Sequence, residues 1–266
     1  MKGAAGLFRL ERTRLLCVVL FCNAFGLGAF GPLLPEIGRS QSLADWQLGL
    51  AAAAFGFARM VAAMPTGLLV ARRLAATLMA APVVIVVGTV LLVAAGPFPM
   101  LLAGRFLLGV AQTLTMIGGL MAMLLDDHGP NASVRLNLFE FSGMLGVLGG
   151  LGLVAVAPSA WGWRASLLIA STPVLVPLLM IPAMSRVFPK APPHDRSDSS
   201  TALERAPGRR ASRIVVALMF GAGIVFALSW SAVSGFVVPI RGTREFGLSR
   251  TGISWLLAII LNPSQY

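Results

Sequence analysis

Residues 100–125 read MLLAGRFLLGVAQTLTMIGGLMAMLL, an apolar stretch of 26 residues whose one charged side chain is Arg105. An α-helix rises 1.5 Å per residue, so this stretch is long enough to cross a hydrocarbon core of about 30 Å. No water is available inside that core, and backbone N–H and C=O groups must bond within the segment, which a helix achieves. The stretch therefore predicts a membrane-spanning helix.

The composition of the whole chain agrees with this prediction. Of its 266 residues, 57% are apolar and 12% are charged, whereas a soluble domain has about 45–50% apolar and about 25% charged residues. The mean hydropathy is +0.84. These values exclude a soluble globular enzyme, a disordered chain and a secreted disulfide scaffold.

Six further apolar runs follow one another with short polar breaks between them, at 15–37, 46–70, 74–95, 136–157, 165–184 and 214–240. Each run holds 20 to 27 residues and is long enough to span a bilayer. An eighth run, 251–261, has 11 residues, or about 16 Å of helix, which is half a span. The pattern predicts an all-α membrane protein built as a polytopic helical bundle.

The formal net charge of +11 follows from the distribution of basic residues. If the N-terminus is cytoplasmic, fourteen of the 21 Lys and Arg residues fall on the inner side and five on the outer side, with two inside spans. This asymmetry is the positive-inside bias of membrane proteins. We therefore expect a multi-pass protein of the cell membrane with a cytoplasmic N-terminus, and we expect no nucleic-acid partner.

Three segments are expected along the chain. Residues 1–184 form a six-helix unit, and residues 185–213, rich in Pro, Ser and charge, form a cytoplasmic loop. Residues 214–266 begin a second unit, because Pro35 and Pro239 align at an offset of 204 and each precedes a polar turn with a basic residue. Two six-span halves are a known transporter plan, and on that register the second half is incomplete.

Ionisable residues inside spans are functional candidates, because lipid penalises charge. The chain has three, Arg59, Arg105 and Glu140. Arg59 has no acidic residue three or four positions away, so it faces another helix or water. Arg105 either reaches the outer interface or faces a central cavity. Glu140 either pairs with Arg135 or the headgroups, or takes part in proton coupling.

Uncharged polar residues within the spans extend this set. Asn23, Gln112 and Trp230 are candidates to line an aqueous translocation path. Each of them is equally suited to an interhelical hydrogen bond.

Signatures of a hydrolase or metal site are missing from the sequence. The two histidines, His128 and His194, lie in hydrophilic loops, and Cys17 and Cys22 occupy different faces of one helix. We therefore expect no enzyme activity, no metal and no cofactor.

Several motifs together resemble the major facilitator superfamily of secondary transporters. Arg105 and Gly109 are similar to the RxxxG signature of its fourth helix, and Gly162 with Trp163 and Arg164 resembles its GWR turn. The remaining matches are Gly67, Arg72 and Arg73 in the loop after the second helix, and the small-residue pair Gly146 and Gly150 in the fifth.

The sequence departs from the family at two of these motifs. The acidic residue and the glycine of the family's loop would fall at Ala71 and Leu74. The fifth-helix glycines resemble the antiporter motif, but Val147 stands where its proline is expected. In the family this loop is thought to hold the closed conformation through charge pairs. The resemblance therefore decides neither whether such pairs form here nor whether the chain is an antiporter.

The resemblance implies a permease for an unidentified small molecule, with efflux and a coupling proton as options. Its twelve-helix plan also implies that the second half is incomplete here. The alternatives are a truncated membrane protein that does not transport, and a membrane enzyme or channel of another type.

Overall fold

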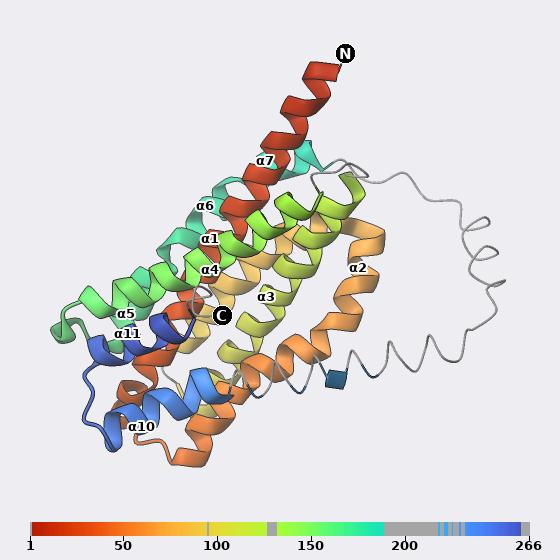
Figure 1. Ribbon diagram of the computed structural model, residues 1–266. Helices are drawn as coiled ribbons and strands as arrows, with labels where there is room; N and C mark the ends of the chain where they lie inside the picture. Colours follow the sequence, from red (N-terminus) through yellow and green to blue (C-terminus); the bar gives the residue numbers. More distant parts are fainter. Residues whose placement is uncertain are drawn as a thin grey trace.

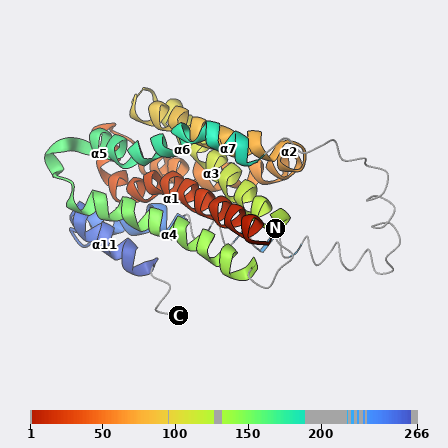
Figure 2. The same ribbon diagram turned by 90° about the horizontal axis from the view of Figure 1, so that it is seen from above.

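The computed structural model describes residues 2–94, 96–126, 132–188 and 232–261, and the single positions 218, 221, 222, 225 and 229. Its helices form an elongated bundle, which Figures 1 and 2 show from two directions. The α-helices are α1 (Lys2–Ser40), α2 (Asp45–Val93), α3 (Phe98–Asp126), α4 (Ala132–Val156), α5 (Gly162–Ser171), α6 (Leu175–Leu179), α7 (Ile181–Val187), α10 (Val238–Arg244) and α11 (Arg250–Ile260). Short 3-10 turns η1 (Ser159–Trp161) and η2 (Thr172–Val174) and the π-turn η3 (Val233–Val237) complete the described elements.

Five helices in the described part of the chain are long and apolar enough to cross a membrane. They contain the predicted runs 15–37, 46–70, 74–95, 100–125 and 136–157 almost entirely, together with the first part of 165–184. Most of the predicted run 214–240 lies outside the described residues. The all-α prediction is confirmed, and within the described ranges no residue is in a strand.

The helix α2 contains two of the predicted spans. It has 49 residues with non-helical backbone angles at Arg73 (φ −148°, ψ 60°). Gly88 packs against Gly104 of α3, and the carbonyl of Phe55 packs against Gly109 of the same helix. In a straight helix Phe55 and Gly88 would lie about 50 Å apart, yet they touch α3 at points about 7 Å apart. The chain therefore folds back at Arg73, and 46–70 and 74–95 are separate legs (Figure 1).

The sixth predicted span is a broken helix. The run 165–184 is divided among α5, η2, α6 and α7. Pro173, Pro177 and Pro182 lie in this region, and proline removes a backbone donor and clashes with the preceding turn. The prolines account for the interruptions, which periodicity in an apolar run does not reveal.

Glycines allow α1 and α4 to cross in backbone contact. An added Cβ at Gly28 would collide with the carbonyl oxygen of Val147, and one at Gly146 or Gly150 would collide with the carbonyl of Phe21 or Phe25. Small residues are what permits such close approach between membrane helices. The fifth-span glycines Gly146 and Gly150 thus serve close packing of α4 on α1.

The internal repeat is visible as a repeated helix–turn–helix at one end of the bundle. The end of α1 leads through a turn into α2, and α10 leads through a turn into α11 (Figure 1). Helix α11 begins after Ser249, whose hydroxyl accepts a hydrogen bond from the backbone N–H of Gly252. Leu151 of α4 packs with Ile253 and Leu257 of α11. The short eighth run therefore docks on the first half.

Candidate functional site

Arg105 lies in the interior of the bundle, on α3. Only 6% of the residue is exposed. Its guanidinium carbon is 3.7 Å from the ring centroid of Phe30 on α1 and 4.6 Å from that of Phe55 on α2. Both rings present the electron-rich faces that attract a cation. Of the two alternatives for Arg105, contact with the outer interface is therefore wrong.

Gly109 explains how Phe55 reaches this arginine. The glycine lies one turn after Arg105 on α3, and an added Cβ there would lie 2.7 Å from Cβ of Ala58 and would collide with the Phe55 carbonyl. The absence of a side chain lets α2 come close enough for the Phe55 ring to contact the guanidinium. The RxxxG spacing thus has a local physical role, which is to bring α2 against the charged turn of α3.

The charge of Arg105 is only partly compensated. Its Nε and Nη1 atoms are buried and have no hydrogen-bond partner among the described residues. Each desolvated cation–π contact contributes about 2 kcal/mol, whereas burying an ion costs several kcal/mol and each unsatisfied polar group about 1–3 kcal/mol. The aromatic contacts therefore do not balance the cost, and the site favours an added anion.

Asn23 and Gln112 lie further along the same two helices as Phe30 and Arg105. Gln112 lies seven residues after Arg105, which is two helical turns along one face of α3. The Nδ2 of Asn23 on α1 donates to the hydroxyl of Thr115 over 3.0 Å, and that hydroxyl donates to the carbonyl of Ala111. The Oδ1 of Asn23 and the Oε1 of Gln112 have no partner within the described part of the chain. Asn23 and Arg105 thus mark two separate points of the α1–α3 contact, and Gln112 lies between Arg105 and Thr115 in the sequence of α3.

The other predicted path residues do not join this group. Arg59 is exposed on α2, with its guanidinium carbon 5.9 Å from the Phe55 ring centroid. Glu140 is exposed on α4. The pairing of Glu140 with Arg135 stays a prediction, and the two residues lie five positions apart on α4, about 140° around the helix. Trp230 lies outside the described residues.

The GWR turn has a mainly structural arrangement. Gly162 has φ +67°, a left-handed conformation that favours glycine. Trp163 is buried, and the guanidinium carbon of Arg164 lies 5.4 Å from its ring centroid.

The bend after the second span is exposed. Arg72 and Arg73 are exposed there, and a Cβ added to Gly67 would meet nothing within 4 Å. Neither arginine forms an ion pair with another described residue.

Two ion pairs join the first half to the second at the end that carries the α1–α2 turn. Arg250 pairs with Glu36 through Nη2 and donates through Nη1 to the hydroxyl of Ser166, with N···O 3.0 Å. Arg244 holds Asp45 with both guanidinium arms, at 2.7 and 2.6 Å. From the sequence, only Arg244 of these residues was singled out, as the basic residue of the repeated turn. The internal repeat could have identified these residues. Each ion pair joins a residue beside the α1–α2 turn to a residue beside the α10–α11 turn.

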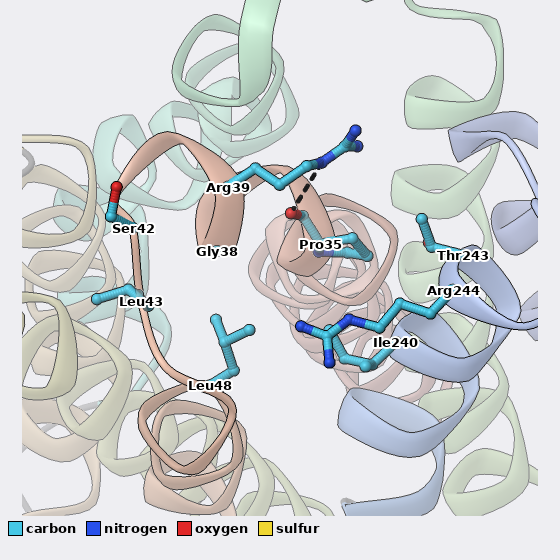
Figure 3. Close-up of a pocket in the computed structure, with 9 residues that line it drawn as sticks. All are labelled: Pro35, Gly38, Arg39, Ser42, Leu43, Leu48, Ile240, Thr243 and Arg244. Atoms are coloured by element: carbon cyan, nitrogen blue, oxygen red, sulfur yellow. Dashed lines mark hydrogen bonds between the residues drawn. The ribbon is translucent and has the colours of Figure 1, made fainter.

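A cavity of about 260 Å³ lies beside these pairs, between the two repeated turns. Arg39 and Arg244 extend beside it, and the Nε of Arg39 donates to the carbonyl of Pro35 (Figure 3). A smaller cavity of about 80 Å³ is lined by Glu36 and Arg250. This end of the bundle is thus closed by charged side chains but is not densely packed.

The chain matches the Major Facilitator Superfamily over residues 16–264. The chain belongs to this superfamily. No curated protein matches it significantly.

Solved structures of other members of the superfamily share the fold. A bacterial homologue of the human lysosomal transporter Spinster, inward-facing and unoccupied, aligns with a TM-score of 0.69 and 17% identity, over 95% of this chain and 60% of its own. The xylose transporter XylE from E. coli, inward open, aligns with a TM-score of 0.58 and 15% identity, over 85% of this chain and 56% of its own. A POT family transporter in complex with 5-aminolevulinic acid aligns with a TM-score of 0.59 and 14% identity, over 86% of this chain and 50% of its own.

The chain spans 60% or less of the length of these superfamily members. At such low identity the likeness concerns the fold alone. The match to the superfamily over residues 16–264 confirms the resemblance stated from the RxxxG and GWR motifs. Together with the apolar helices, it identifies a multi-pass membrane protein of a transporter superfamily.

Proposed function

We propose that the chain forms part of a secondary transporter of the cell membrane that carries a small molecule by alternating access. The first six spans form one wall of the path, and residues 214–266 begin the other. The central binding region is the α1–α3 contact with Arg105, Asn23 and Gln112. Such transporters rock one half against the other around a site near the bilayer midplane.

The observation that carries this proposal is the reciprocal exchange of ion pairs between the repeats. The start of α2 (Asp45) binds the end of α10 (Arg244), and the start of α11 (Arg250) binds the end of α1 (Glu36). Both contacts lie at one end of the bundle, so they hold the halves together there. Opening this end to admit or release a substrate requires both pairs to separate.

The two pairs differ in their surroundings. In the Asp45–Arg244 pair both side chains are more than half exposed, at 58% and 57%, and such pairs add little to stability. The Glu36–Arg250 side chains are 28% and 12% exposed, so water screens their attraction less. Glu36 is therefore the more informative residue to change.

Glu36→Gln is expected to make the closed end more accessible. Thr243 lines both cavities at this end, so a single cysteine at Thr243, with Cys17 and Cys22 replaced by alanine, reports on opening. We expect an impermeant maleimide to label this cysteine faster in the Glu36→Gln chain than in the unaltered chain, because the neutral amide loses the charge attraction to Arg250.

Glu245→Gln is the matched control. Glu245 pairs with Arg241 four positions away, with N···O 3.2 Å, and does not bridge the halves. Its neutralisation is expected to leave the labelling rate unchanged. Equal rates in all three chains would count against alternating access and favour the non-transporting alternative.

The proposed orientation places the ion-pair end outside the cell. Single cysteines at Ser42, in the α1–α2 turn, and at Ser199, in the 185–213 loop, are expected to differ in intact cells. An impermeant reagent should label the cysteine at position 42 and spare the one at position 199, because fourteen basic residues favour a cytoplasmic location for the opposite side. The reverse labelling pattern would show an inverted protein.

Coupling to a proton stays part of the proposal without an assigned residue. Glu140, the candidate from sequence, is exposed on α4 and is not part of the Arg105 group.

A further inference from the structure

We propose that the substrate is an organic anion that also carries a hydrogen-bond donor, with its acid group bound by Arg105 and its donor bound by Asn23. The inference rests on the proposed transport function and names the chemistry of the molecule carried. Four atoms carry it, Nε and Nη1 of Arg105, Oδ1 of Asn23 and Oε1 of Gln112, all buried and all without a partner among the described residues.

Arg105 is a donor site without an acceptor. The rings of Phe30 and Phe55 hold the cation, but an aromatic face offers no oxygen to its N–H groups. Nε carries one N–H and Nη1 carries two, so three of the five guanidinium donors are unpaired within the described part of the chain. A carboxylate or phosphate matches this fork with two parallel charge-assisted bonds.

The described part of the chain supplies no counterion for Arg105. Glu36, Asp45 and Glu245 are engaged with arginines at the closed end. Glu11 and Glu140 are exposed on α1 and α4, and Asp126 lies 21 residues after Arg105 on the same helix. An acid group for Arg105 therefore comes from outside these residues, and a transported ligand supplies it in the binding step.

Asn23 is an acceptor site with a fixed orientation. The hydroxyl of Thr115 donates its proton to the carbonyl of Ala111, so towards Asn23 it acts only as an acceptor. The amide nitrogen of Asn23 must then face Thr115, as the 3.0 Å contact shows, and Oδ1 faces away from it. A hydroxyl or amino group of a ligand is the donor that this oxygen lacks.

The separation of the two ends sets the ligand's shape. Asn23 and Phe30 are seven residues apart on α1, or about 10 Å along the helix. The Oε1 of Gln112 lies two turns from Arg105 on α3 and offers a further acceptor between them. The structure thus favours an acid whose donor group sits at the far end of an apolar body. Because all four atoms are buried, a ligand reaches them only after the side chains around the α1–α3 contact move.

A series of three probes tests the chemistry on the unaltered 266-residue chain. They are 8-aminooctanoate, which has both groups, 8-aminooctanamide, which lacks the acid, and octanoate, which lacks the donor. A ligand that binds the folded state raises the unfolding temperature with its concentration. We expect 8-aminooctanoate to give the largest increase, octanoate a smaller one and the amide none. If the amide acts as well as the acid, or if no acid has any effect, the proposal is wrong.

Variants of Arg105 and Asn23 then test which residue binds the acid group of the probe and which binds its donor group. Arg105→Met is expected to weaken 8-aminooctanoate by about tenfold or more and to abolish the difference between acid and amide. Arg105→Lys keeps the charge but loses the planar fork of the guanidinium. Its affinity for 8-aminooctanoate should lie between those of the unaltered chain and the Arg105→Met chain. Asn23→Leu should remove the advantage of 8-aminooctanoate over octanoate while leaving the acid requirement. If Arg105→Met keeps its preference for the acid, another cation binds the ligand.

The accessibility assay at position 243 separates this inference from the proposed function. If Glu36→Gln opens the end and the probes fail, the substrate class is wrong while alternating access stands. If the labelling never changes, the transport function itself fails, whatever the probes do.

Discussion

Gly150→Ala is expected to destabilise the protein more than any other single methyl group added within the described helices of the first half. The new Cβ would collide with the carbonyl oxygen of Phe25 and lie 3.0 Å from its carbonyl carbon. The obstacle is backbone, so no side chain can rotate away, and α1 and α4 must separate. Overpacking costs about 1–3 kcal/mol and occasionally more, and we expect the upper end of that range. The measurement is the midpoint of unfolding in detergent.

Gly152→Ala is the matched control on the same helix. A Cβ at Gly152 would meet nothing within 4 Å, and alanine is favoured over glycine in a helix by about 1 kcal/mol. This variant should be as stable as the unaltered chain or slightly more stable. A similar loss in both variants would mean that the α1–α4 contact is not what the glycines protect.

Arg105→Met is expected to raise stability while weakening ligand-dependent stabilisation. Methionine keeps an unbranched apolar stem against Phe30 and Phe55 and favours contact with aromatic rings. The change removes a buried charge whose Nε and Nη1 have no described partner. Replacing buried ionic groups by apolar ones of similar volume can stabilise a protein by about 1–4 kcal/mol, and we expect a gain of this order in the free energy of unfolding.

Arg59→Met provides the comparison for this gain. Arg59 also lies within a span, but it is exposed, so the protein desolvates its charge less than that of Arg105. We expect a stability change within about 0.5 kcal/mol, as for most surface substitutions. If Arg105→Met instead destabilised the chain, the guanidinium would stabilise the fold. It would then not be a binding group whose burial lowers the stability of the protein.

The spans were predictable because the bilayer imposes a length and an apolar composition that the sequence records directly. The runs 100–125 and 136–157 appear as α3 and α4 with shifts of a few residues. The breaks in the run 165–184 were harder to predict, because the three prolines there interrupt the helix without making it more polar. The fold-back at Arg73 was predictable from the polar break before residue 74.

The site was predictable only in part. Arg105 stands out as a charge inside a span, but nothing in the spacing of α1 and α2 identifies Phe30 and Phe55 as its neighbours. Arg59 and Glu140 satisfy the same sequence criterion and are exposed. A single sequence says that a residue lies at membrane depth, but the direction in which it points depends on how the helix is rotated against its neighbours.

The ion pairs at the closed end depend on contacts across 199 and 214 positions of the chain. Charges at helix ends are ordinary in membrane proteins, so Glu36 and Asp45 carry no local signal. Their importance follows from the repeated turns, which bring the ends of α1 and α10 together.

The short turn between α10 and α11 holds Arg244 and Arg250 close to each other, so that their two ion pairs are coupled. Five residues separate Arg244 from Arg250, and one of them, Gly247, has φ +60°. The turn is fixed by a backbone hydrogen bond of 2.9 Å from the N–H of Leu248 to the carbonyl of Gly242. When one arginine has bound its carboxylate, the other is held near its own partner at high effective concentration. We therefore expect the two contacts to form and to separate together rather than one after the other.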